Sequence, residues 1–173
     1  MPIKIIWGDD FAACDRAIEE LITKIVDPSW ASINLSRLDG ADPIQAKQAL
    51  EECQTAPFGN GGRIIFLKRS PICNNCPIDL TESFEKVIDL IPEKTYLILN
   101  NSNKPDKRLR TTKRIMELVK SNKASEKSYT MPPIWDSNGQ RIFVQNTAND
   151  LGIKITESAA ECMVASLGND SSR

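Results

Sequence analysis

Apolar residues along the chain follow two alternating patterns. Short runs in which nearly every position is apolar predict strands buried on both faces, as in a parallel sheet. Four such runs are present, at Ile3–Trp7, Ile33–Leu38, Arg63–Leu67 and Thr95–Leu99. A fifth strand is expected at Ser128–Met131, where Pro132 and Pro133 would end it.

Between these runs, apolar residues recur at the spacing of amphipathic helices. The first helix follows Asp9 and Asp10, which can cap it, and the second and third open at Asp42 and Asp79. A fourth helix is expected from Leu109 to Asn122. The expected inward-facing residues are Phe11, Cys14, Ile18, Leu21, Ile22 and Ile25 in the first helix, Ile44, Ala49, Leu50 and Cys53 in the second, Leu80, Phe84, Val87, Ile88 and Ile91 in the third, and Leu109, Ile115, Met116 and Val119 in the fourth.

Strands that alternate with helices predict an α/β fold, a parallel sheet flanked by helices. Two more amphipathic helices, Ser137–Leu151 and Thr156–Leu167, follow the double proline. Gly152 and Gly168 lie where helix ends favour glycine. We therefore predict an α/β domain at residues 1–133 and a small helical domain at residues 134–173.

The composition narrows the possible chemistry. The chain has 173 residues and a net charge of −1, which predicts no general attraction to nucleic acids or membranes. It has no histidine, which excludes Ser–His–Asp and Cys–His catalysis and histidine-containing zinc sites. No apolar run is long enough to cross a bilayer, and no signal-peptide pattern is present. We expect a cytoplasmic protein without membrane contact.

In a fold of this kind, the loop after the first strand is where the phosphates of a nucleotide would bind. That loop, Trp7–Asp15, has one glycine, no lysine, and acidic residues where the phosphates would lie. The strand Thr95–Leu99 ends in Asn100 and Asn101, without a carboxylate to hold Mg²⁺. We expect no cofactor, no metal and no intrinsic catalysis. The alternative is an α/β enzyme with a degenerate nucleotide-binding loop.

A glycine-rich loop, Ala56–Gly62, lies between the second helix and a buried strand. Its glycines and Asn60 favour a tight turn with Pro57 and Phe58 at the tip. An aromatic side chain presented there would suit an apolar pocket of a partner protein. The alternative is that Phe58 folds back into the core of its own domain, as buried phenylalanines commonly do.

The segment at residues 103–114 is densely basic. Its cationic residues are Lys104, Lys107, Arg108, Arg110, Lys113 and Arg114. The segment straddles the start of a helix, where the helix dipole opposes positive charge. This unfavourable placement suggests a partner, either DNA phosphates or an acidic surface of a neighbouring subunit. The alternative is a surface that contacts only solvent.

Cys73 and Cys76 form a single CxxC pair. Structural zinc needs four ligands, and the sequence offers no second pair. A redox pair favours a helix N-terminus, whereas Pro71 and Pro77 bracket this one and the helix starts later. A thiol or metal protein that uses these two cysteines is a further alternative. Trp135, just after the double proline, is expected to pack at the domain junction.

Taken together in this order, several segments resemble the delta subunit of bacterial DNA polymerase III, in the form found in cyanobacteria. They cover nearly the whole chain. The matching segments are Trp7–Phe11, Ala56–Arg63, Asn101–Leu109, Leu151–Thr156 and Gly168–Asp170.

The resemblance implies an AAA+-like, RecA-type α/β domain followed by the start of a small helical lid domain. It implies a clamp-loader subunit of the DNA polymerase III holoenzyme, a DNA-directed nucleotidyltransferase. Such a subunit binds the sliding clamp (the beta subunit) and helps open its ring during DNA replication, but binds no ATP. The expected partners are the clamp, the other clamp-loader subunits and primer-template DNA.

In the family, a hydrophobic pair after the second helix enters a pocket of the clamp. At the matching positions this chain has Pro57 and Phe58, with Thr55 and Ala56 beside them. Proline departs from the usual large aliphatic residue, so Phe58 is the expected anchor. Family members are longer and carry a collar domain after the lid, so we interpret the chain as an N-terminal fragment.

Overall fold

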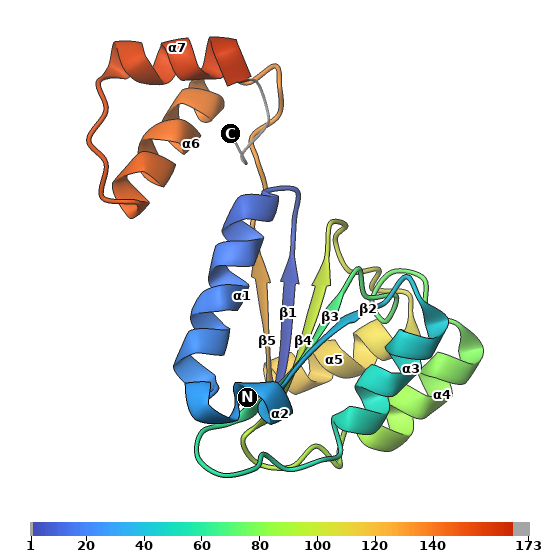
Figure 1. Ribbon diagram of the computed structural model, residues 1–173. Coiled ribbons are helices and arrows are strands. Elements are labelled where there is room, and N and C mark those ends of the chain that lie inside the picture. The colour runs from blue at the N-terminus through green and yellow to red at the C-terminus, as the bar shows by residue number, and fades with distance from the viewer. Residues whose placement is uncertain (1, 168–173) are drawn as a thin grey trace.

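The computed structural model describes residues 2–167 and places a parallel sheet between two layers of helices (Figure 1). Within these residues the sheet has five strands in the order β2-β3-β4-β1-β5, and every neighbouring pair is parallel. The strands are β1 (Ile3–Trp7), β2 (Leu35–Asp39), β3 (Arg63–Lys68), β4 (Thr95–Asn101) and β5 (Ala124–Ser128). The predicted α/β fold is therefore confirmed.

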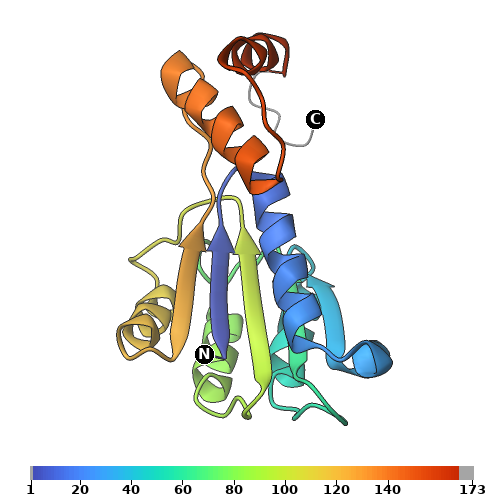
Figure 2. The same ribbon diagram turned by 90° about the vertical axis from the view of Figure 1, so that its left-hand side faces the viewer.

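Helices cover both faces of the sheet, as Figures 1 and 2 show. Helix α1 lies on one face, and α3, α4 and α5 pack on the other. The helical segments are α1 (Phe11–Ile25), the short 3-10 helix η1 (Pro28–Trp30), α2 (Ala31–Asn34), α3 (Pro43–Glu52), α4 (Ile78–Val87), α5 (Arg110–Lys120), α6 (Ser137–Asp150) and α7 (Glu157–Leu167). None of the helices described is long and apolar enough to span a membrane.

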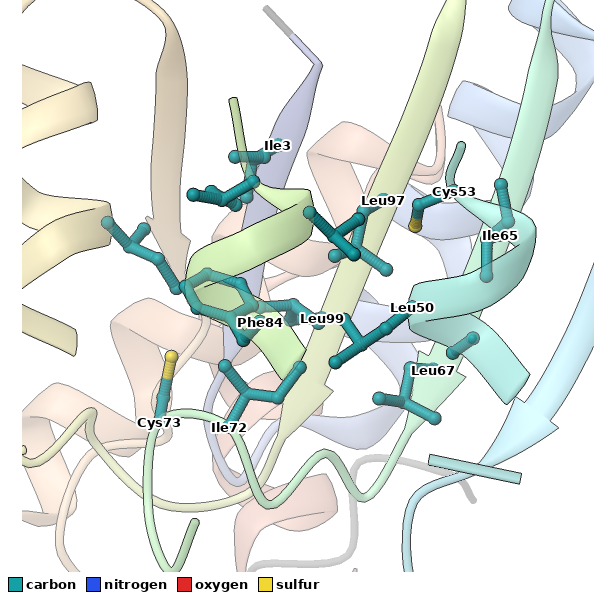
Figure 3. Close-up of a cluster of buried hydrophobic side chains, with 14 of the residues drawn as sticks. Ile3, Leu50, Cys53, Ile65, Leu67, Ile72, Cys73, Phe84, Leu97 and Leu99 are labelled. Atoms are coloured by element: carbon teal, nitrogen blue, oxygen red, sulfur yellow. The ribbon is translucent and has the colours of Figure 1, made fainter. Parts of the chain in front are cut away.

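The central strands are apolar at consecutive positions because each face of the sheet has its own core. In β3, Ile65 and Leu67 point toward the layer of α3, α4 and α5, whereas Ile64 and Phe66 point toward α1. Figure 3 shows the larger cluster, with Phe84 of α4 at its centre. Burial on both faces explains why these strands could be recognised from short apolar runs.

The two edge strands differ from the prediction. The fifth strand was predicted at Ser128–Met131, but β5 occupies Ala124–Ser128. It pairs with β1 alone and exposes its last three residues, so it carries no apolar run. At the other edge, β2 starts at Leu35, because the first residues of the predicted strand Ile33–Leu38 belong to α2.

Three helix predictions need correction. Phe11 was expected to face inward from α1, but it is 60% exposed. Ile44 was expected on the apolar side of α3, but it lies in the first turn with 78% of its surface exposed. The buried residues are Ala46, Ala49 and Leu50, which share one face of the helix at the spacing i, i+3 and i+4, and Ile44 lies outside that face. Helix α4 starts at Ile78 after Pro77, so Asp79 lies in its first turn and not at the cap.

Helices α6 and α7 pack on each other beyond the carboxyl ends of the strands (Figure 1). Gly152 ends α6 with a φ of +74°, which confirms its predicted role, whereas Gly168 lies outside the described residues. Trp135 was predicted to pack at the junction, but it is 86% exposed. The division into domains at residues 133 and 134 stays a prediction.

Candidate functional site

The loop between α3 and β3 lies at the amino-terminal ends of the strands. We call residues 53–62 the anchor loop. The Thr95 hydroxyl donates a hydrogen bond of 2.9 Å to the Thr55 carbonyl, which fixes the start of the loop to β4. At its end, the Gly62 N–H donates to the Ile25 carbonyl at 2.7 Å. Both ends of the loop are thus tied to neighbouring elements.

Phe58 is held through its main chain by one buried side chain. The Phe58 N–H donates to Oδ1 of Asn34 at 2.9 Å, and Nδ2 of Asn34 donates to the Phe58 carbonyl at 2.8 Å. Asn34 ends α2 and is fully buried. Both polar groups of Phe58 are therefore satisfied without a neighbouring strand.

The Phe58 side chain lies against Trp30, which belongs to η1. The two rings meet edge to face, with centroids 4.8 Å apart and an interplanar angle of 72°. Gly59 has a φ of +67°, and a Cβ at this position would lie 2.5 Å from the Trp30 ring. The glycine therefore allows the indole to pack closely against the turn of the anchor loop.

The anchor loop presents its aromatic residue to solvent. Phe58 is 56% exposed, and Ile33 of α2 is 48% exposed. Thr55 and Ala56 are exposed as well, and Pro57 is half-buried. The alternative in which Phe58 folds into its own core is therefore wrong. That these four loop residues contact a clamp stays a prediction.

An ion pair supports the base of the loop. Arg63 at the start of β3 contacts Glu52 at the end of α3, with an N–O distance of 3.1 Å. The same guanidinium donates to the Ile33 carbonyl at 2.8 Å. Arg63 thus joins α2, α3 and β3 at the base of the anchor loop.

The basic segment follows β4 at the carboxyl-terminal ends of the strands, on the opposite side of the sheet from the anchor loop. Its cations fall into two groups. Arg108 pairs with Asp106, Arg110 with Glu85, and Arg114 with Asp89 and Glu117. The guanidinium and the backbone N–H of Arg108 both donate hydrogen bonds to the Asp106 carboxylate, and they lower the pKa of that carboxyl to about 2. Within residues 2–167, Lys104, Lys107 and Lys113 are exposed and form no ion pair. The free positive charge of the segment is therefore carried by lysines.

Cys73 and Cys76 are arranged unlike a reactive thiol pair. Cys73 is 3% exposed, and burial raises its thiol pKa to about 12. Burial also raises the pKa of Cys76. The thiolate is the form that attacks disulfides and binds metals, so a raised pKa disfavours both roles. Among the described residues, no group of three or more Cys, Asp or Glu side chains could hold a metal ion.

We expect thiol labelling of the folded chain to follow burial. At pH 8, a thiol with a pKa of about 12 is ionised to about 1 part in 10⁴, so Cys53 and Cys73 should not react with iodoacetamide. Cys162 is exposed and should react first. Peptide mapping after timed labelling measures this order. Rapid modification of Cys73 in the folded chain would contradict the burial argument.

The loop after β1 packs closely against the backbone of the segment that follows β5. Gly8 has a φ of +144°, and a Cβ there would lie 1.6 Å from the Tyr129 carbonyl oxygen. The Asp10 N–H donates to that carbonyl at 3.2 Å, and the Asp9 carboxylate accepts from the Met131 N–H at 2.8 Å. The Asp10 side chain caps α1. The N–H groups of Gly8, Asp10 and Ala13 therefore already have partners within the chain and are not available to a phosphate.

We accordingly expect ATP to leave the chain's stability unchanged. A nucleotide at 100 times its Kd would raise the free energy of unfolding by about 2.7 kcal/mol. Thermal unfolding with and without roughly 1 mM Mg-ATP measures any rise in Tm, and titration calorimetry measures binding directly. A clear rise in Tm would support the degenerate nucleotide-binding alternative.

The strand order and the helices on both faces define the class, a parallel α/β protein whose loop after β1 lacks the glycine and lysine pattern of a phosphate-binding loop. Residues 5–128 match the family described as DNA polymerase III, delta subunit, and the chain therefore belongs to that family. The match covers most of the α/β part, including the anchor loop and the basic segment. The cyanobacterial form suggested by the sequence stays a prediction.

The structure is similar to the Bacillus subtilis DNA clamp loader delta protein, with a TM-score of 0.72. The similarity covers 95% of this chain at 20% sequence identity, so it shows a shared fold. The chain spans about half of that protein, 48% of its length. No curated protein sequence matches this chain at a significant level.

Three contributors to the anchor loop were not predicted from the sequence: Trp30, Ile33 and Asn34. Asn34 lies 24 residues before Phe58 and forms hydrogen bonds with it across the fold. The sequence around Ile33 predicted the start of a strand, so Ile33 and Asn34 were not recognised as neighbours of the anchor loop. The one available clue was Gly59, which marks a turn but does not identify the ring packed against it.

Proposed function

We propose that this chain is a clamp-binding module of the replicative clamp loader and that Phe58 is its anchor. Membership of the delta subunit family and the exposed, well-supported aromatic residue of the anchor loop support this proposal. The observation that carries it is that a 56% exposed Phe58 sits on a loop tied down at both ends. Interfaces use such aromatic anchors in buried pockets of the partner.

The mechanism requires no bond chemistry in this chain. A ring-shaped clamp opens when a partner binds the open interface more tightly than the closed one. The shift is limited by that difference in affinity. In this mechanism the anchor loop supplies binding energy to the clamp, and other clamp-loader subunits supply nucleotide hydrolysis. This role places the chain in the cytoplasm, with the replication machinery.

The proposal is tested by titrating the chain with the sliding clamp of the same organism. We expect saturable binding with a defined stoichiometry by calorimetry, and competition by a peptide that occupies the apolar pocket of the clamp. Binding that survives a saturating amount of the peptide would place the contact elsewhere. No binding at all would reject the proposed function.

We propose a second contact for the basic segment, with the phosphates of primer-template DNA. The support is the set of three exposed lysines that form no ion pair with any described residue, Lys104, Lys107 and Lys113. Phosphate contacts by lysine are sequence-independent and weaken as salt increases. The three arginines of the segment already neutralise carboxylates, so they contribute less to such a contact.

Charge reversal separates these groups. Changing Lys104, Lys107 and Lys113 to glutamate should weaken DNA binding and reduce its salt slope by roughly 2 to 3. The matched control changes the exposed Lys24, Lys47 and Lys86 to glutamate, which alters the net charge equally. Fluorescence anisotropy at several salt concentrations measures both variants. Equal losses in the two would show a general charge effect and no DNA site in the basic segment.

A further inference from the structure

We propose that Asn34 and Trp30 are positioning residues that hold Phe58 in its clamp-binding arrangement before the clamp arrives. The inference rests on the proposed function, because it concerns how the same anchor is presented. It adds a claim of its own, that the anchor loop is already formed in the free chain. Affinity for the clamp would then depend on two residues that need not enter its pocket.

The first support is the pair of hydrogen bonds between Asn34 and Phe58. One amide side chain satisfies both the N–H and the carbonyl of Phe58, at 2.9 and 2.8 Å. The amide is 0% exposed, whereas the side chain of the residue it holds is 56% exposed. A buried amide with both groups paired fixes the main chain of an otherwise exposed residue.

The second support is the close packing of Trp30. Its ring contacts Phe58 edge to face and also lies where a Cβ of residue 59 would be. The indole therefore limits the orientations of the Phe58 ring and occupies the space beneath the turn. A glycine with φ of +67° at position 59 makes this packing possible.

The third support is that the elements carrying these residues are themselves fixed. Arg63 donates to the Ile33 carbonyl at 2.8 Å, which holds α2 next to Asn34. Asp27 caps η1 by accepting from the Ser29 N–H, just before Trp30. The Val26–Gly61 bridge joins the same region to the far end of the anchor loop.

Together these contacts reduce the ordering that binding would require. A loop that must be immobilised on association loses affinity through that ordering, whereas a preformed loop does not. The effect of Asn34 and Trp30 is thus to supply Phe58 in one main-chain conformation. They act on recognition through the position of Phe58.

The substitution Asn34→Asp tests this role. At neutral pH the introduced carboxylate can still accept from the Phe58 N–H but has no proton to donate to its carbonyl. The N–H acceptor is kept, but losing the bond to the Phe58 carbonyl and burying a charge destabilise the closed loop, so in the free chain we expect local opening to let the Phe58 amide exchange with solvent at least roughly tenfold faster than in the wild type. Hydrogen exchange followed by NMR measures this without any clamp.

Clamp affinity should fall roughly tenfold in Asn34→Asp at pH 7.5. When the introduced carboxyl is protonated at lower pH, it regains a donor and resembles the original amide. Because the site is fully buried and faces a carbonyl, the pKa of the introduced carboxyl should be raised above the ordinary aspartate value, and the ratio of variant to wild-type affinity should rise toward 1 as the pH falls toward about 5. A loss of global stability caused by the buried carboxylate would also be relieved by acid, so urea unfolding of the variant at both pH values checks that it is fully folded wherever its affinity is compared.

Asn74→Asp is the matched control. Asn74 also makes two side-chain hydrogen bonds, to the Lys104 carbonyl and with Asn101, but at the opposite edge of the sheet. It should leave clamp affinity unchanged at both pH values. If Asn34→Asp fails to fold, as judged by circular dichroism, Gly59→Ala is the second variant, since it displaces the Trp30 ring and removes no polar group. We expect a roughly tenfold loss of affinity there as well.

The outcomes separate this inference from the proposed function. Wild-type binding that is lost in Phe58→Ala but unchanged in Asn34→Asp and Gly59→Ala would overturn the inference alone. Equal Phe58 exchange in wild type and Asn34→Asp would also overturn it, even if the chain binds no clamp. Faster exchange with acid-reversible loss of affinity would establish Asn34 as a positioning residue.

Discussion

Replacing Phe58 by alanine is expected to weaken binding to the sliding clamp by roughly 100-fold, the effect typical of a central aromatic anchor. The side chain is more than half exposed in the free chain, so its burial in a pocket of the clamp would be lost in the variant. Calorimetry or surface plasmon resonance with the clamp measures the change. Most of it should appear in the dissociation rate.

The chain offers a matched control in Phe11→Ala. Phe11 is 60% exposed, but it opens α1 at the opposite edge of the sheet. Removing it deletes the same side chain from a similarly exposed position, and clamp affinity should not change. If Phe58→Ala binds as tightly as the wild type, Phe58 is not the anchor. If both variants lose affinity equally, the loss does not come from a specific contact of the anchor loop.

Replacing Phe84 by alanine is expected to lower the free energy of unfolding by about 3–5 kcal/mol, the range for large-to-small changes in well-packed cores. Phe84 is fully buried at the centre of the cluster beneath α3, α4 and α5 (Figure 3). The surrounding strands and helices cannot close the cavity without losing their own packing.

Urea unfolding followed by circular dichroism measures this loss. It is a large share of the total free energy of unfolding of a folded domain, which is about 5–15 kcal/mol. Phe11→Ala is again the control, and an exposed phenylalanine should change the free energy of unfolding by no more than about 0.5 kcal/mol. A loss below about 1 kcal/mol for Phe84→Ala would mean that the α4 layer packs less tightly than the structure shows.

The central part of the fold could be predicted because its signals are local. Strands β1, β3 and β4 are buried on both faces, so their apolar runs stand out in the sequence. The edge strand β5 has one paired side and polar exposed residues, and it was misplaced for that reason. Ile44 and Trp135 are apolar but exposed, and residue type alone does not reveal exposure.

For the candidate site, too, the local features could be predicted from the sequence and the long-range contacts could not. A glycine-rich loop with Phe58 near its tip is a local pattern, and the resemblance to delta subunits pointed to that residue. Its support by Asn34 and Trp30 is a contact between segments far apart in the chain, which no periodic pattern encodes. Arg110 pairs with Glu85 of α4, and Arg114 pairs with Asp89 just after that helix. The sequence therefore showed six equivalent cations, whereas the structure divides them into paired arginines and unpaired lysines.

The strand order has a consequence for how the protein is made. Strand β1 is the first to leave the ribosome, yet its partners are β4 and β5, where Ile3 pairs with Leu97 and Ala124. At roughly 5 to 20 residues per second, synthesis delivers β4 about 5 to 20 s after β1. During that interval the apolar strand β1 has no neighbour to pair with, and such late, long-range pairing slows folding. We expect the nascent chain to depend on chaperone protection until residue 128 has emerged, because only then can β1 take its place between β4 and β5.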